Sequence, residues 1–375
     1  MNFELTEEQR MIQESVERFI DDNYDLESRV ATSARDPGFS ADHWNTMAEL
    51  GWLGLPFAEA DGGFGGNQVD VMVIMEQFGR GLVLEPYLAS VVMGGGALKR
   101  GGSETLKSEM LPGVIDGSRQ LCFAYAEQQA RFDLHDVTTT ARKEGETFVL
   151  NGQKSMVQNA ATASQIVVST RTSGGQVDED GITLFLVDAD ADGVASSNFP
   201  TVDGLRASEV SFRDVSVSAD RVLGEVGGGF EILNAVANDA MLALGAEAIG
   251  TMEILYKDTV AYTQEREQFD HPLSDFQVLQ HRMVEMFMEY EQCKSMLYRA
   301  TLEAVAGDPE TAQKAVHGLM HVVGKYGYFI GENAVQLHGG MGVTEELRLG
   351  HYFKRLVVID TMFGNADFHL QKFAA

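Results

Sequence analysis

The spacing of apolar residues changes twice along this chain of 375 residues. Up to about Gly117 they recur every three or four positions between glycine-rich turns, which is typical of amphipathic helices. From Arg119 to about Leu223 the apolar runs are short and β-branched, which favours strands, and from Gly227 long helical patterns return. The sequence therefore predicts an α+β fold with an N-terminal helical domain, a middle antiparallel, barrel-like β domain and a C-terminal four-helix bundle, over residues 1–118, 119–226 and 227–375.

Two local signals refine this prediction. Thr6, followed three residues later by Gln9, predicts a capping box at the start of the first helix. Asn151-Gly152 follows a short apolar run, and because both residues tolerate positive φ, the dipeptide predicts a two-residue hairpin turn.

Composition limits the classes of partner. Fifty-six acidic residues against 28 Lys and Arg give a net charge of −28, which would repel nucleic-acid phosphates and anionic lipid. The N-terminal stretch is acidic and amphipathic, and no run of about 18 uncharged apolar residues occurs. We therefore expect a cytoplasmic protein that binds neither nucleic acid nor membrane. Cys122 and Cys293 lie far apart, so neither a disulfide framework nor a zinc site is predicted.

Two C-terminal motifs carry the strongest functional signal, YTQEREQFDHPLSDFQ over 262–277 and QLHGGMGVT over 336–344. They resemble the flavin-binding signatures of acyl-CoA dehydrogenases. Arg266 offers a planar fork of donors suited to a diphosphate, and Gly339 and Gly340 allow close backbone approach. The resemblance implies that one group of residues binds the FAD of a neighbouring subunit: Arg266, Gln268, Phe269, Phe276, Gln277, Gln336, Gly339 and Gly340.

The middle region matches the family less closely. LNGQKSMVQNAATASQIVV resembles the strand pair that lies against the flavin ring, with Met156 and Gln158 where tryptophan and threonine are usual. The loop from Ala126 to Asp133 lacks the family's proline, glycine and serine. The resemblance implies that Ala126, Met156, Gln158 and Asn365 contact the cofactor.

The family's chemistry is dehydrogenation of an acyl-CoA: a carboxylate removes the α proton, the flavin takes the β hydride, and electrons pass to an electron-transfer flavoprotein. Phe363 stands where that carboxylate usually lies, and Ala240 stands at the alternative position. Met241 replaces an arginine that helps to hold CoA. Three acids remain as weak candidates for the base: Asp239, Glu247 and Asp367.

Two functional hypotheses follow. The first is a homodimeric or tetrameric acyl-CoA dehydrogenase with a relocated base. The second is a non-catalytic, flavin-binding subunit in a heteromer with a related chain; GRGLVLEPYL and VVIDTMFGNADFHL resemble small subunits of the pimeloyl-CoA dehydrogenase type.

His317 and His321 lie four residues apart, as metal-binding histidines can, but HGLMH lacks the glutamate of HExxH and we predict no metal site.

Overall fold

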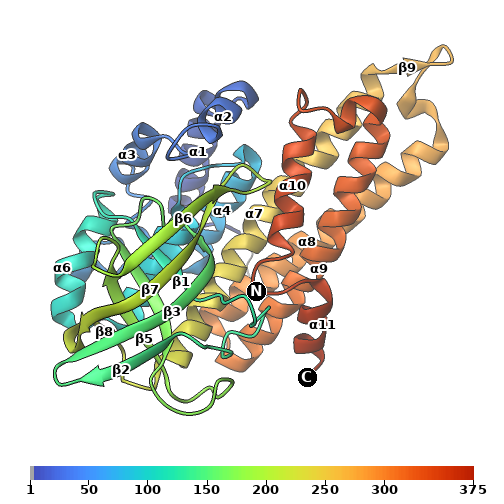
Figure 1. Ribbon diagram of the computed structural model, residues 1–375. Helices are drawn as coiled ribbons and strands as arrows, with labels where there is room; N and C mark the ends of the chain where they lie inside the picture. The colour runs from blue at the N-terminus through green and yellow to red at the C-terminus, as the bar shows by residue number, and fades with distance from the viewer. Residues whose placement is uncertain (1–3) are drawn as a thin grey trace.

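The computed structural model describes residues 4–375 and begins with a helical region (Figure 1). The first helix opens with the predicted capping box, since the Gln9 N–H donates to Thr6 Oγ1 at 3.2 Å and the Thr6 N–H donates to Gln9 Oε1 at 3.0 Å. The segment η2 is a π-helix rather than an α-helix. The helices of this region are α1 (Glu7–Asn23), α2 (Leu26–Ser33), α3 (Ala41–Glu49), α4 (Gln68–Gly81), η2 (Leu88–Gly95), α5 (Gly96–Gly101) and α6 (Glu104–Ile115).

The middle region forms one eight-stranded sheet with its own apolar core. The strands follow the order β6-β7-β3-β2-β4-β5-β8, and β1 pairs with β4. Most pairings are antiparallel as predicted, but β1 and β2 both run parallel to β4, which makes the sheet mixed. The strands are β1 (Leu121–Ala124), β2 (Thr140–Glu144), β3 (Thr147–Gln158), β4 (Gln165–Arg171), β5 (Ile182–Asp188), β6 (Val194–Pro200), β7 (Arg206–Ser218) and β8 (Val222–Leu223).

The hairpin predicted at Asn151-Gly152 is wrong, because both residues lie inside β3. The chain reverses earlier, at Gly145, whose φ of +63° suits the turn between β2 and β3. The Asn151 side chain accepts the N–H of Asp214 at 2.9 Å, and the register between β3 and β7 shifts at this point. Asn-Gly therefore forms a bulge, because β7 provides the partners that a free turn would lack.

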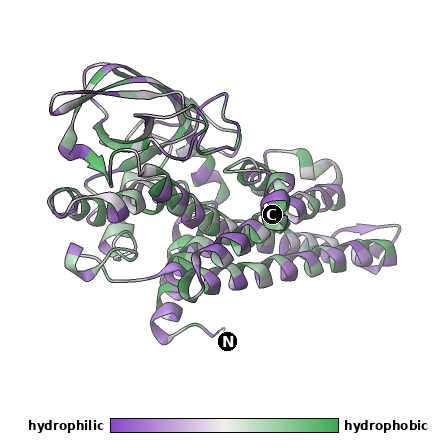
Figure 2. Cartoon of the chain, turned by 90° about the horizontal axis from the view of Figure 1, so that it is seen from below, coloured by the Kyte–Doolittle hydropathy of each residue, from purple (hydrophilic) through white to green (hydrophobic). Residues whose placement is uncertain are grey.

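The C-terminal region is helical, as predicted, but in place of a four-helix bundle it has three long helices, α7, α8 and α9, with two shorter ones, α10 and α11. The long helices lie side by side in Figure 2. Helix α7 is long and apolar enough to cross a membrane by length and composition, yet 72% of its apolar window is buried in the molecule, as in a core helix of a globular protein. A short hairpin, β9–β10, lies at the far end of the bundle (Figure 1). The elements are α7 (Gly229–Glu265), β9 (Glu267–Gln268), β10 (His271–Pro272), α8 (Gln277–Ala306), α9 (Pro309–His338), α10 (Leu349–Ile359) and α11 (Ala366–Ala374).

Candidate functional site

A cavity of about 680 Å³, which we call the large cavity, lies between the β sheet and the end of α10. Four positions singled out in the sequence line it: Ala126, Met156, Gln158 and Phe363. Met156 is 53% exposed, and the Gln158 amide nitrogen lies 3.7 Å from the sulfur of Met362. The structure thus brings together the β-domain residues and the position of the missing base.

Phe363 forms an aromatic wall of this cavity. Its ring stacks on Tyr125 with centroids 4.8 Å apart and planes 8° from parallel. Only 7% of Phe363 is exposed, and its φ of +59° places it in a sharp turn after α10. Asn365 follows this turn, but its side chain caps α11 by accepting the N–H of Phe368 at 2.9 Å, and it does not line the large cavity. An aromatic ring here can pack against a ligand but cannot accept a proton.

Glu127 lines the large cavity but is already ion-paired. Its Oε1 accepts from Lys154 Nζ at 2.7 Å and from the Thr139 N–H at 3.0 Å. Burial alone would raise the pKa of Glu127. The Lys154 ammonium and the hydrogen bonds from Thr138 and Gln129 together outweigh burial and lower this pKa to about 2. A carboxylate with so low a pKa is a poor proton acceptor.

Glu247 is bound in a buried ion cluster that joins the three regions. Arg355 on α10 donates to both oxygens of Glu247 on α7, at 2.6 and 2.7 Å, and to Asp203 before β7 at 2.8 Å. Arg29 on α2 donates to the Asp203 carbonyl at 2.9 Å. Although burial lowers the pKa of Arg355, the two carboxylates raise it above its ordinary value. Glu247 is therefore a structural partner of Arg355 here.

The other two candidate bases lie away from the large cavity. Asp239 pairs with Arg100 at 2.5 Å and lines a different cavity. Burial raises its pKa, while Arg100 acts in the opposite direction. Asp367 is exposed in the first turn of α11. Neither residue lines the large cavity beside Phe363.

The C-terminal motif residues gather at the far end of the bundle. Tyr262 at the end of α7 stacks on His338 at the end of α9, with centroids 4.2 Å apart, so the two motifs lie side by side. We define the bundle-end surface as Arg266, Gln268, Gln336, Gly339 and Gly340, all of which are exposed. Phe269 is 85% exposed at the tip of the β9–β10 hairpin, Phe276 is half-buried, and Gln277 is exposed at the start of α8.

Part of the bundle-end surface is open to a ligand, although the Gln268 amide donates to the Glu267 carbonyl oxygen at 2.7 Å. In residues 4–375 the Arg266 guanidinium has no ion pair, and a Cβ added at Gly339 or Gly340 would meet no atom within 4 Å. None of the residues of this surface lines the large cavity. One chain therefore carries two separate sets of cofactor-type residues that do not meet each other.

The two histidines considered as metal ligands anchor α11 instead. His317 Nδ1 lies 2.9 Å from His369 Nδ1, and His321 Nδ1 lies 2.9 Å from the Ala366 carbonyl oxygen. Across the described residues 4–375, no cluster of three or more His, Cys, Asp or Glu side chains is arranged to hold a metal ion. These contacts fix the helix that follows the Phe363 turn.

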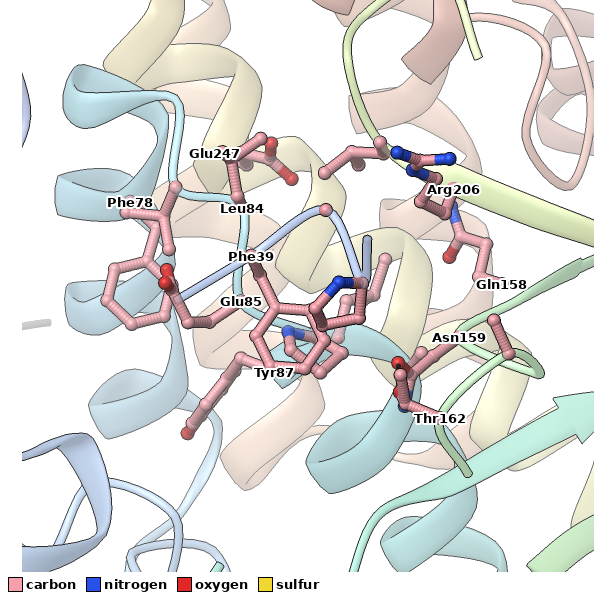
Figure 3. Close-up of a pocket in the computed structure, with 18 of the residues that line it drawn as sticks. Phe39, Phe78, Leu84, Glu85, Tyr87, Gln158, Asn159, Thr162, Arg206 and Glu247 are labelled. Atoms are coloured by element: carbon pink, nitrogen blue, oxygen red, sulfur yellow. Dashed lines mark hydrogen bonds between the residues drawn. The ribbon is translucent and has the colours of Figure 1, made fainter. Parts of the chain in front are cut away.

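A small central cavity of about 70 Å³ adjoins the large one, since Ala89, Gln158 and Arg206 line both (Figure 3). Glu85 lies on its wall with its side chain fully buried, and burial raises its pKa to about 7. It accepts the Tyr24 hydroxyl and, at 3.2 Å, the Ser40 N–H, so it ties α1 and α3 to the loop before η2.

Sequence reasoning missed Glu85, Asp203 and Arg355. A signal did exist for two of them, because LVLEPYL and KRLVVI each place a charged residue beside an apolar run. Such a charge is buried only when a partner satisfies it, but the partner comes from a distant segment, which the sequence does not identify.

Comparison with known proteins agrees with the order of the three regions along the chain. Three family models match in order: acyl-CoA dehydrogenase N-terminal domain over residues 6–118, middle domain over 122–215 and C-terminal domain over 227–375. A probable acyl-CoA dehydrogenase of Bacillus subtilis is 28% identical over 351 residues, covering 92% of this chain and 91% of the relative.

Two solved structures are also similar. A chain of a variant of the Tcur3481–Tcur3483 steroid ACAD is 28% identical with a TM-score of 0.88, covering 98% of this chain and 97% of that one. A chain from the structure of the electron-transferring flavoprotein of Acidaminococcus fermentans is 25% identical with a TM-score of 0.91, covering 100% and 98%.

Proposed function

Because this chain belongs to the acyl-CoA dehydrogenase family, we propose that it serves acyl-CoA dehydrogenation as a flavin-binding subunit that supplies no base. The observation that carries this proposal is Phe363, which stacks on Tyr125 where the family's carboxylate is expected. Three acids considered above, Glu127, Glu247 and Asp239, are each held in an ion pair. A related chain would provide the base.

FAD is the cofactor of this family, and the bundle-end surface suits its diphosphate. Among the residues that the structure describes, Arg266 presents an unpaired planar cation, and the backbone at Gly339 and Gly340 is open to a bulky ligand. When bound, FAD would accept the hydride from the β carbon of the acyl group. Arg266 would hold the diphosphate, and Gln336 would donate its side-chain amide to the same cofactor.

The separation of the two sets of residues supports a shared site. A flavin on the bundle-end surface of this chain would reach the large cavity of another chain, because this chain's own large cavity includes none of those residues. The name of the steroid ACAD relative joins two designations, Tcur3481 and Tcur3483, which supports a heteromer over a homomer. Similarity to a chain from an electron-transferring flavoprotein structure supports that class of protein as the electron acceptor.

The test begins with the chain expressed alone, its flavin counted by visible absorbance, followed by anaerobic addition of a panel of acyl-CoA thioesters. We expect absent flavin, or flavin that stays oxidised. Flavin that bleaches with any thioester, and stays oxidised in Asp239→Asn, Glu247→Gln or Asp367→Asn, would establish the self-sufficient enzyme instead. Folding of each variant is checked by circular dichroism.

A further inference from the structure

A third cavity, of about 250 Å³, lies between α4, the η2–α5 segment and α7, and the proposed function does not use it. We call it the α4–α7 cavity. Its walls are mainly apolar, formed by residues that include Phe57, Met72, Val92 and Leu242. A cavity of this size with apolar walls suits a small aliphatic group.

Cationic donors gather among the polar residues of this cavity. Arg100 donates to Asp239 at 2.5 Å and to the Gly96 carbonyl at 3.5 Å, which leaves some of its five N–H groups without a protein acceptor. Lys99 donates to the Pro56 carbonyl at 2.6 Å, one of its three possible hydrogen bonds. Two cations and one carboxylate thus line this cavity, although the protein as a whole has a net charge of −28. A further carboxylate, Asp61, acts on Lys99 from outside the lining.

The wall beside these cations has unusual backbone geometry. The η2 segment is a π-helix, a rare form that is frequently found at functional sites. Ala89 and Met93 line the large cavity, while Val91 and Val92 line the α4–α7 cavity, so η2 separates the two. Gly96 lines the α4–α7 cavity beside the Arg100 guanidinium, since a Cβ added at Gly96 would lie 3.7 Å from an Arg100 terminal nitrogen.

We propose that the α4–α7 cavity binds a medium-chain fatty acid, with its carboxylate on Arg100 and Lys99 and its chain against the apolar walls. The planar fork of Arg100 matches a carboxylate, and such charge-assisted hydrogen bonds are stronger than those to a neutral hydroxyl. Asp239 would compete with the ligand for Arg100. This inference stands independently of the proposed role in dehydrogenation.

The test is isothermal titration of the full-length chain with octanoate and, separately, with octanol. We expect octanoate to bind at least about tenfold more tightly than octanol, because only the carboxylate forms charge-assisted bonds. Arg100→Gln should weaken octanoate about tenfold or more without changing octanol. Asp239→Asn should strengthen octanoate, since it removes the competing carboxylate. Arg142→Gln, on the exposed surface of β2, is the matched control and should change neither affinity.

Four outcomes would overturn the proposal. Equal affinity for octanoate and octanol would remove the role of the cations, and an unchanged octanoate affinity in Arg100→Gln would do the same. Undiminished binding in Val71→Phe, whose larger side chain fills the cavity, would place the ligand elsewhere. Octanoyl-CoA is the remaining arm: if it binds as tightly as octanoate and is equally sensitive to Arg100→Gln, the cavity takes thioesters rather than free acids.

Discussion

The bundle-end surface and the large cavity carry the two sets of residues that we propose for cofactor binding, and the two sets differ in how their polar groups are paired. Arg266 on the bundle end is exposed and has no ion pair within residues 4–375. In the large cavity, Glu127 and Asp203 are each paired with a cation of the same chain. A group that is already paired stabilises the fold, whereas an unpaired cation in an acidic protein remains available to an anionic ligand. This difference supports our proposal that the chain offers its bundle-end surface to the cofactor of a neighbouring chain.

The largest expected effect concerns Glu247, and it separates a structural acid from a base. Glu247→Gln leaves Arg355 buried with one carboxylate fewer, which should lower the free energy of unfolding by about 3–5 kcal/mol in urea titrations. Glu104→Gln removes an exposed partner of Lys107 and should cost less than about 1 kcal/mol. A Glu247→Gln protein of normal stability that loses flavin reduction would reverse this assignment.

Phe363→Glu tests whether a carboxylate at this position is enough to make the large cavity catalytic. The variant loses the stack on Tyr125 and buries a carboxylate in its place, so we expect about 2–3 kcal/mol lower stability. The isolated chain should still leave flavin unbleached by acyl-CoA, because Met241 and the altered loop at Ala126 remain. Phe363→Leu controls for lost packing. Bleaching by the glutamate variant alone would show that only the base is missing.

The stability of the protein should also depend on pH through the His317–His369 pair, which lies behind the Phe363 turn. Burial lowers the pKa of His317 to about 4 and that of His369 to about 3. Unfolded histidine titrates near 6.5, so the unfolded chain binds more protons than the folded one between about pH 4 and 6.5. Stability should therefore fall as pH decreases, by about 1 kcal/mol per histidine between pH 7 and 5.5.

Urea titrations of the native chain and of a His317→Gln, His369→Gln double variant at both pH values measure this slope. The double variant should show a shallower dependence on pH. An equal slope in the two proteins would mean that the histidine pair does not set the acid response of this wall.

The smallest expected effect is that of Asp239→Asn on dehydrogenation. Its ion pair with Arg100 is partly exposed, with side-chain exposures of 22% and 29%, so stability should change by less than about 1 kcal/mol. Flavin reduction in the native assembly, followed by stopped-flow absorbance, should keep its rate. A loss of a hundredfold or more would identify Asp239 as a base.

Much of this fold could be predicted from the sequence because apolar periodicity and local caps are short-range signals. The helix–strand–helix order and the Thr6 cap are confirmed. Asn151-Gly152 failed because a turn signal and a bulge signal use the same positive-φ tolerance, and the choice depends on β7, about 60 residues away. Family motifs pointed to both regions that we propose for cofactor binding, but the separation of these regions within one chain depends on tertiary structure. The pairing of Glu247 with Arg355, 108 residues apart, has no local signal at all.

The most direct test compares the two regions in the assembly purified with this chain from its native cells, by counting FAD per protomer. Arg266→Gln alters the bundle-end surface, and Gln158→Ala alters the large cavity of the same chain. We predict that Arg266→Gln removes most of the FAD, while Gln158→Ala leaves the count unchanged. Loss of FAD in Gln158→Ala with full retention in Arg266→Gln would contradict the account, because the chain would then hold flavin in its own large cavity.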